Sequence, residues 1–512
     1  MSNKHKNVQD KTVETLISII QDKCELFRDK QGNTYAKTQG KTNISENKQE
    51  KEFTKVMKIR SPEFGELVRK FHYDTTKKGL KKLALEEVIE TISTIATYEG
   101  HTEEVYLRTC QREGEIIYDL CRADWSVIKI TRDGWKLLDR SPVSFVRTGN
   151  MKSLPIPASM PNRDARRGIY KFLKHVNIRE DELYLVVGWL LMSMQAGSGA
   201  YPLMVANGSA GSGKSTFIRM MRAVIDPNQA DLLAPPKPDD IKVLSEGNHV
   251  LAFDNLSKLS PQLSDALCRV ATGDNQTVRK KYSDNDAFTV SIKKPMAMNG
   301  IVDFVTRGDL ASRSIKISLQ KIETRKTEDM AWKDFNDDLP EIFAALLDGL
   351  SHALRNIDNV IVNDMTRLAD FCQWATAAHT AYDWEESAFM DAYIENVKLS
   401  HVDTLDASPF SSAIVELCDD RGGFHNRPMV LLAKLEETYV SDKSRFSAGW
   451  VKTSKGVVNQ LDKIQTSLEA IGIHYKKYKD RANKTFVVLG DKDFKGYEKF
   501  LNVRELVEDL DF

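Results

Sequence analysis

The sequence has 512 residues, of which 41% are apolar and 29% are charged. This length predicts roughly three domains, each with enough apolar residues for a core. The formal net charge of zero excludes a chain-wide basic field for a polyanionic partner, although local asymmetry can still exist.

Cysteine spacing and hydropathy indicate in which cellular compartment the protein is expected. The six cysteines are scattered and none forms a C-x-x-C pair, so the sequence predicts neither a zinc site nor a disulfide framework. The longest apolar run, Leu183–Met194, is too short to span a bilayer, which takes about 20 residues. The N-terminus lacks the apolar core of a signal peptide. We therefore expect a soluble, cytoplasmic protein with no membrane partner.

Residues 1–160 are expected to form an α+β region that serves as a collar or as a partner-binding or DNA-binding module. The run CELFRDKQGNTYAKT (24–38) predicts a hairpin with a Gln-Gly-Asn turn. The stretch Thr38–Glu52 has almost no apolar residues and predicts a loop. Residues 83–100 have helical apolar spacing and end on a glycine, which indicates a helix with a glycine C-cap. The Pro-rich stretch Leu154–Asn162 marks the first boundary.

Residues 161–360 alternate between helical and strand-like patterns. The strand-like runs lie at 201–207 and 249–255, and the helical runs end near Gln195 or cover 215–225 and 338–357. This rhythm predicts an α/β fold with a parallel sheet. Residues 361–407 are expected to be a helical linker. Residues 408–512 carry short helices followed by two strand-like runs, which predicts a domain like a winged helix.

The run GSAGSGKS matches G-x-x-x-x-G-K-[ST], between an apolar strand and a helix. Because glycines carry no side chain, the backbone of this run can turn many N–H groups toward phosphate oxygens. The helix that follows adds the positive end of its dipole. We expect the lysine to reach the β- and γ-phosphates of ATP and the first serine after it to ligate Mg²⁺. A Gly/Ser-rich connector is the alternative. The predicted nucleotide-binding residues are Gly208, Ser209, Ala210, Gly211, Ser212, Gly213, Lys214, Ser215 and Thr216.

A second acidic element follows in VLAFDNL. Asp254 falls at the expected end of a strand, where a Walker B carboxylate supports Mg²⁺. An ordinary turn aspartate is the alternative. Asn255 stands where many such ATPases have glutamate. Asparagine cannot accept a proton as a base, but it can orient water.

The stretch Ser264–Leu319, with its SDALCRVATG, KKPMAMNGI and RGDLASR segments, resembles the AAA+ ATPases of bacterial phages and mobile elements, near the superfamily III and MCM-like helicases. The resemblance implies that Asn299 is sensor 1, which orients the attacking water. It also implies that Arg307 is an arginine finger acting on the neighbouring subunit, with Arg313 sharing that role or making a second contact in trans. A turn asparagine and surface ion pairs are the alternatives.

Two basic segments are candidate DNA contacts. TVRKKY and FTVSI predict a hairpin that carries Arg279, Lys280 and Lys281 before its turn. The resemblance implies that this hairpin projects into a ring channel and grips nucleic acid; a lysine-protected edge strand is the alternative. In the C-terminal domain, the lysines of the first strand suit phosphate contacts, although a charged hairpin in a protein-binding domain would look similar. These lysines are Lys476, Lys477 and Lys479.

The best interpretation is an ATP-driven, ring-forming DNA motor, a replicative helicase of a mobile element. We expect a homo-oligomer, most simply a hexameric ring, with single-stranded DNA in its channel, and a primase or another replication protein could be a partner. One rival is an AAA+ remodeller or defence ATPase that acts on protein. The other is a nucleotide-gated DNA-binding initiator with little turnover.

Overall fold

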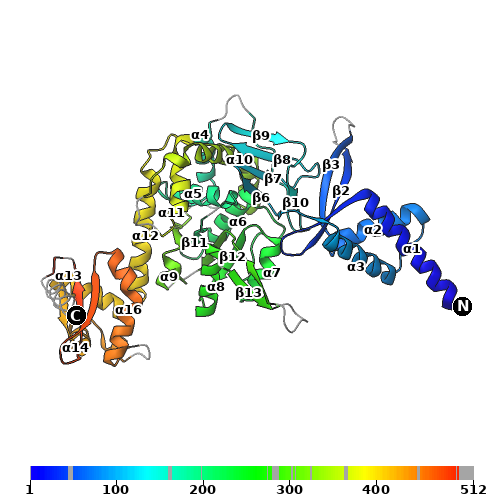
Figure 1. The fold of residues 1–512 in the computed structure, drawn as a ribbon. Helices are drawn as coiled ribbons and strands as arrows, with labels where there is room; N and C mark the ends of the chain where they lie inside the picture. Colours follow the sequence, from blue (N-terminus) through cyan, green and yellow to red (C-terminus); the bar gives the residue numbers. More distant parts are fainter. Residues whose placement is uncertain are drawn as a thin grey trace, which may run out of the picture.

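The structure is a computed structural model. It describes residues 2–43, 50–159, 164–197, 199–273, 275–279, 287–300, 304–305, 307–322, 326–362, 367–446, 450–491 and 493–494. The molecule is elongated, with the N-terminal elements at one end, an α/β core in the middle and the C-terminal elements at the other end (Figure 1). Within the described residues, no helix combines the length and apolar character needed to cross a membrane.

The core is built on a parallel sheet of four strands in the order β12-β15-β11-β16. Its strands read as almost continuous apolar runs because both faces of a parallel sheet are covered. Leu203 and Val205 pack on one face, whereas Met204 and Ala206 pack on the other, as the alternation of strand side chains requires. The strands are β11 (Leu203–Asn207), β12 (Leu251–Leu256), β15 (Met296–Gly300) and β16 (Ser314–Ser318). The mixed α/β fold and the parallel sheet predicted from the sequence are confirmed.

Two groups of helices cover the two faces of this sheet. The larger group contributes most of the main core: α4 (Ala165–Leu173), α5 (Glu182–Met194), α6 (Lys214–Ile225), α10 (Glu328–Asn356) and α11 (Ala369–Ala377). The smaller group packs on the opposite face: α7 (Asp240–Gly247), α8 (Pro261–Thr272) and α9 (Gly308–Ala311). The predicted helix that ends near Gln195 and the predicted helix over 215–225 are both confirmed. The predicted helix over 338–357 starts ten residues earlier, at Glu328, where Thr327 caps its first turn.

The N-terminal elements form a sheet in the order β3-β2-β1-β4 packed against three helices. The β1–β2 hairpin is confirmed. The expected loop over Thr38–Glu52 is wrong for its two flanks, because 38–43 and 50–52 belong to paired strands. The stretch has almost no apolar residues, so the sequence pattern resembled a loop. The elements are α1 (Ser2–Lys23), β1 (Cys24–Arg28), β2 (Thr34–Asn43), β3 (Glu50–Lys58), α2 (Pro62–Thr76), α3 (Lys82–Tyr98) and β4 (His101–Thr102).

A four-stranded antiparallel meander, β6-β7-β8-β9, follows and packs on the main core. Tyr118 on β7 is fully buried there, and its hydroxyl donates to the carbonyl of Ile225 at the end of α6. The short strands β5 and β10 pair in parallel beside it. The bounds are β5 (Val105–Tyr106), β6 (Thr109–Arg112), β7 (Glu115–Asp119), β8 (Val127–Thr131), β9 (Gly134–Leu138) and β10 (Ser144–Phe145).

The remaining elements extend from the core. β13 (Asn275–Arg279) and β14 (Ala287–Ser291) form a separate two-stranded hairpin. The short helices η1 (Ile357–Asn359) and η2 (His379–Ala381) and the long α12 (Ala388–Asp406) lead to the C-terminal elements. Those are α13 (Pro409–Arg421), β17 (Gly423–Asn426), α14 (Pro428–Thr438), α15 (Asp442–Arg445), α16 (Ser454–Ala470), β18 (His474–Lys479) and β19 (Thr485–Gly490). Their sheet has the order β17-β19-β18 around a separate apolar core.

Candidate functional site

The glycine loop leaves the central strand β11 and enters helix α6. Gly213 has a φ of 86°, a left-handed conformation that glycine adopts without strain, and it forms the N-cap of α6. Gly208 has a φ of 148°, and a Cβ there would lie 2.7 Å from both the Leu319 carbonyl oxygen and Ser212 Oγ. The sequence therefore needs glycine at these places to curl the backbone over the start of the helix.

Polar groups around this loop suit an anionic ligand. No side chain caps the first turn of α6, so its N–H groups remain for a ligand. Among the described residues, the buried atoms Ser212 Oγ and Asn207 Oδ1 have no hydrogen-bond partner. Lys214 Nζ donates to the carbonyl oxygens of Gly208 and Ser209 at 2.7 and 2.8 Å, and so lies folded across the loop. A phosphate group can accept hydrogen bonds from the Ser212 hydroxyl and the Lys214 ammonium group, whereas Asn207 Oδ1 is itself an acceptor.

The carboxylate of Asp254 lies at the centre of a hydrogen-bonded cluster beside the loop. The Ser215 hydroxyl donates to Asp254 Oδ1 at 2.8 Å, and the Asn299 amide donates to the same oxygen at 2.7 Å. The Asn299 side-chain oxygen accepts the backbone N–H of Asn255 at 2.9 Å. Four predicted site residues come from three separate segments of the sequence, and the fold brings them together: Ser215, Asp254, Asn255 and Asn299.

Asn255 adopts a left-handed backbone conformation with a φ of 58°. The pairing of β12 with β15 shifts register between Phe253 and Leu256, so the strand bulges at this residue. Asparagine tolerates positive φ better than most residues, including glutamate. The bulge is a physical reason for asparagine at a position where glutamate was the expected residue.

Asn177 is a site residue that the sequence analysis missed. Its amide donates to the Ser212 carbonyl oxygen at 3.4 Å and to the Gln320 carbonyl oxygen, so it ties the glycine loop to the segment after β16. No motif surrounds Asn177, and its partners are far away in the sequence. Only the fold shows this contact.

The two arginines predicted to act in trans have different environments. The Arg307 side chain is 45% exposed, and its Nη1 lies 2.8 Å from Asp265 Oδ1 and donates to the Pro261 carbonyl oxygen at 3.0 Å. The Arg313 side chain is 16% exposed and donates to Asp309 Oδ1 at 2.6 Å. Both guanidinium groups are therefore bonded to segments other than the glycine loop of their own chain.

Arg367, which the sequence analysis did not single out, joins this cluster. It donates to Asp309 Oδ1 at 2.6 Å and to Ser312 Oγ at 2.8 Å. Partial burial would raise the pKa of Asp309, but hydrogen bonds from Arg313 and Cys268 and the charges of both arginines outweigh it and lower that pKa. Arg313 and Arg367 therefore share one ionised carboxylate, whereas Arg307 is held separately.

The predicted DNA-binding hairpin lies only partly within the described residues. Strands β13 and β14 pair as expected, and Arg279 lies at the end of β13 opposite Ala287. Lys280 and Lys281 lie outside the described residues. The role of this hairpin stays a prediction.

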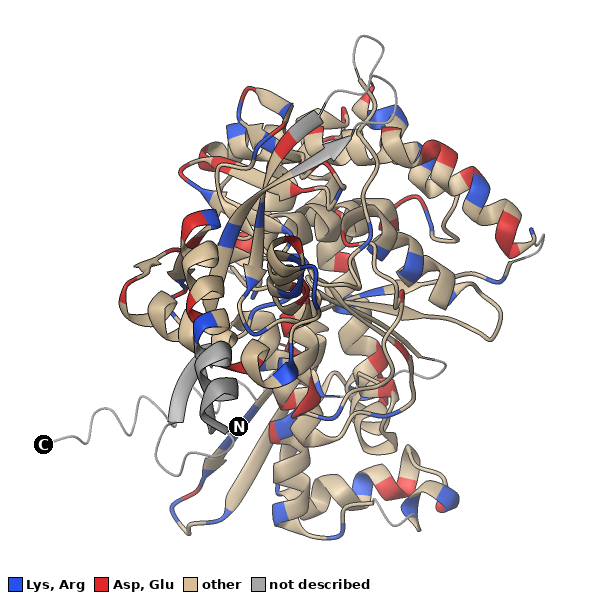
Figure 2. Cartoon of the chain, turned by 90° about the vertical axis from the view of Figure 1, so that its right-hand side faces the viewer, with Lys and Arg blue, Asp and Glu red and all other residues tan. Residues whose placement is uncertain are grey.

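The three lysines of the C-terminal domain that are predicted to contact DNA lie on β18. Lys477 Nζ bonds Asp462 on α16 at 2.6 Å, Lys479 is exposed, and Lys476 is half-buried. A groove of about 520 Å³ separates β18 from the start of α16 and is lined by Lys455, Lys477 and Lys479, among others. Across the view of Figure 2, Lys and Arg are interspersed with Asp and Glu, in keeping with the net charge of zero.

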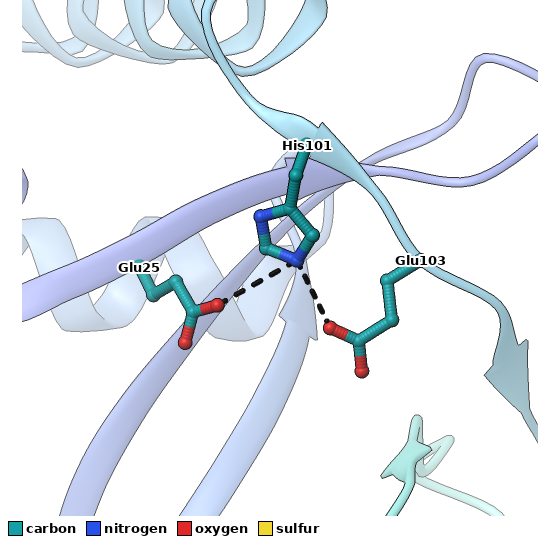
Figure 3. Close-up of side chains that lie close together, drawn as sticks. All are labelled: Glu25, His101 and Glu103. Atoms are coloured by element: carbon teal, nitrogen blue, oxygen red, sulfur yellow. Dashed lines mark hydrogen bonds and ion pairs between the residues drawn. The ribbon is translucent and has the colours of Figure 1, made fainter.

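Among the described residues, one group of possible metal ligands lies in the N-terminal region: Glu25, His101 and Glu103 (Figure 3). His101 Nε2 lies 3.1 Å from Glu103 Oε2 and 3.6 Å from Glu25 Oε1. However, Lys37 Nζ lies 2.9 Å from Glu103 Oε2 and 3.8 Å from Glu25 Oε2. The ammonium group already supplies the cation between these carboxylates, so the arrangement favours an ion-pair network over a metal site.

A parallel sheet whose central strand delivers a glycine loop to a helix N-terminus defines a P-loop-like core. Residues 169–398 match the family described as the actinomycete integrative conjugative element replication protein (AICE RepA), and residues 410–493 match the AICE RepA C-terminal domain. The two matches span more than half of the chain, which belongs to this family of mobile-element replication proteins. The expected relation to proteins of mobile elements is confirmed.

Solved structures with similarity to the chain are distant. One described as "SCCmec type IV Cch - active helicase" is 11% identical and covers 92% of this chain and 93% of its own, with a TM-score of 0.46. The apo C-terminal region of NrS-1 is 12% identical over 93% of this chain and 98% of its own, with a TM-score of 0.36. A ligand complex of JCV helicase is 13% identical over 46% and 65%, with a TM-score of 0.25. No curated protein matches the chain.

Proposed function

We propose that this chain is an ATP-driven, ring-forming DNA motor, the replicative helicase of a mobile element. One observation carries the proposal: Ser215, Asp254 and Asn299 converge within hydrogen-bond distance beside a glycine loop whose buried Ser212 hydroxyl lacks a partner. That arrangement is typical of sites that bind and hydrolyse nucleoside triphosphates. Membership of a family of replication proteins supports DNA as the substrate on which the motor acts.

ATP binding requires little change in this site. Lys214 now caps two loop carbonyls and can turn its ammonium group to the β- and γ-phosphates. The Ser215 hydroxyl and Asp254 carboxylate are hard oxygen ligands lying side by side, and they would hold Mg²⁺. The ion, when bound, neutralises charge on the phosphate oxygens. Asn255 and Asn299 orient water near the γ-phosphate.

The motor works as a ring in this proposal, as a AAA+ hexamer does. Arg307 is half-exposed and turned away from its own glycine loop, which supports a role in the site of the adjacent subunit. Arg313 is largely buried and bound to Asp309, which supports a structural role for this arginine. An arginine supplied in trans stabilises the charge of phosphoryl transfer and can change the rate by 10³–10⁵.

The proposed DNA contacts lie in two places. The β13–β14 hairpin, with Arg279, Lys280 and Lys281, grips single-stranded DNA in the channel. The C-terminal domain (408–512) is a winged helix that contacts phosphates through the lysines of β18; the order α13, β17, α14, α16, β18, β19 and the sheet order β17-β19-β18 support this. Residues 1–160 serve as a collar or recruit a partner such as a primase, 161–360 are the AAA+ core, and 361–407 link it to the winged helix.

Comparing ATPase activity with and without single-stranded DNA tests the proposal. A DNA motor is stimulated by DNA. An unchanged rate favours a remodeller that acts on protein. Tight binding of ATP and DNA with little turnover favours a nucleotide-gated initiator. Of the two alternatives, the initiator is the stronger, because Asn255, with its left-handed backbone at a strand bulge, stands in place of a catalytic glutamate.

A further inference from the structure

Both acceptors that hold Arg307 lie on one face of helix α8. Its Nη1 donates to the Pro261 carbonyl oxygen and pairs with Asp265, and these two positions are four residues apart, one turn along the helix. Arg307 has five N–H donors, and both bonds use the same nitrogen. Within the described residues, Nη2 and Nε of Arg307 make no bond.

Helix α8 is also joined to the strand that carries Asp254 and Asn255. Strand β12 ends at Leu256, and α8 begins at Pro261 after a short connection capped by Ser260. Leu263 and Leu267 of α8 share a buried core with Phe253, the residue before Asp254. The strand that carries Asp254 and the helix that holds Arg307 therefore share one packed core.

The segment after Arg307 packs on the same core. Leu310 on α9 is buried with the apolar side chains of α8, and α9 contacts α8 directly. Arg307 is the N-cap residue of α9, with extended backbone. Its backbone is thus fixed by α9, while its side chain is fixed by α8.

We propose that Asp265 is a positioning residue for catalysis in trans, an inference that rests on the proposed function of Arg307. Asp265 holds Nη1 of Arg307 so that Nη2 and Nε are left to bind phosphate oxygens in the adjacent subunit. Because Asp265 lies on α8, and α8 packs on strand β12, Asp265 also connects Arg307 with the strand that carries Asp254 and Asn255 in the same subunit.

The test is Asp265→Asn, which removes the charge and keeps the size of the side chain. Asp334→Asn is the matched control, because Asp334 on α10 forms an ion pair with Lys326 that is exposed to a similar degree. Asp265→Asn should lower kcat by about tenfold to a hundredfold and leave KM for ATP and the melting temperature unchanged, since misplacing a catalytic group costs that much in rate. Asp334→Asn should behave as wild type.

Two further measurements separate positioning from structure. Arg307→Ala with Asp265→Asn should be no slower than Arg307→Ala alone, because Asp265 acts only through that arginine. Asp265→Asn mixed with Lys214→Ala in co-purified mixed oligomers should regain activity, because the Lys214→Ala subunits supply a well-positioned Arg307 to intact glycine loops. Additive losses in the double variant, no rescue in mixed oligomers, or wild-type or faster turnover in Asp265→Asn would overturn the proposal. Wild-type turnover in Arg307→Ala would instead overturn the role of Arg307 itself.

Discussion

The amide of Asn299 on β15 donates to the carboxylate of Asp254 on the adjacent strand β12 at 2.7 Å. The oxygen of the same amide accepts the backbone N–H of Asn255, so one buried side chain fixes both residues at the end of β12. This side-chain bridge holds Asn255 and Asn299, the groups proposed to orient water, beside Asp254, which accepts a hydrogen bond from Ser215 after the glycine loop. It also explains why changes at these residues should separate nucleotide binding from hydrolysis.

Lys214→Ala should abolish ATPase activity while the melting temperature stays within a few degrees of wild type. The ammonium group lies over the loop backbone and not in the apolar core, so its loss costs little stability. Steady-state ATPase and thermal unfolding check this. Lys333→Ala, an exposed lysine on α10, is the control and should keep full activity. Wild-type turnover in Lys214→Ala would refute the assignment of the loop.

Asn255→Gly should slow hydrolysis and leave the Kd for ATP nearly unchanged. Glycine accepts the left-handed backbone of residue 255, so the variant removes the amide without the strain that alanine would add. Single-turnover kinetics and nucleotide binding measure the two effects separately. If the chain is a slow switch, wild type and variant will turn over equally slowly. Loss of ATP binding in Asn255→Gly would contradict both the water-orienting role of Asn255 and the slow-switch alternative.

Lys280→Ala combined with Lys281→Ala should weaken binding of single-stranded DNA and flatten its dependence on salt, because fewer counterions are released. Basal ATPase should not change. Affinities at several salt concentrations supply the slope. A slope and affinity equal to wild type would favour the edge-strand interpretation of the hairpin.

His249 predicts a pH dependence of stability. Burial lowers its pKa to about 4, although the charge of Asp226 opposes this shift, and its ring bonds the Ser193 carbonyl oxygen. The folded pKa is below the unfolded value near 6.5, so the unfolded state binds the extra proton first. Stability should therefore fall as pH drops from 6.5 toward 4, with a contribution of up to about 1.4 kcal/mol per pH unit.

Urea unfolding of wild type and His249→Gln between pH 7.5 and 4.5 measures this contribution. The variant should be less stable at pH 7.5 but lose less stability on acidification. Parallel pH profiles for the two proteins would show that His249 does not titrate as inferred.

Local motifs were predictable from the sequence, whereas contacts between distant segments were not. The glycine loop and Asp254 have local signatures, because a phosphate-binding loop needs closely spaced glycines and its Mg²⁺ site needs a carboxylate at a strand end. Asn299 came only from the family resemblance. Asn177 and Arg367 were missed, because each acquires its site contacts from partners distant in sequence.

Gly100 shows a second limit of sequence patterns. A glycine after the last helical residue predicted a C-cap, but its φ is not in the positive region. A Cβ at Gly100 would instead lie 2.5 Å from the Ala96 carbonyl oxygen and 2.9 Å from that of Leu26 on β1. The glycine permits close approach of helix and strand, which depends on packing that a local pattern does not contain.

The most direct test of the central claim is ATP-dependent unwinding of a forked DNA duplex, with Lys214→Ala as the matched inactive chain. Wild type should separate the strands only when ATP and Mg²⁺ are present, whereas Lys214→Ala should bind the fork without separating it. A wild-type protein that hydrolyses ATP and binds the fork but leaves the duplex intact would contradict the claim that this chain is a DNA motor.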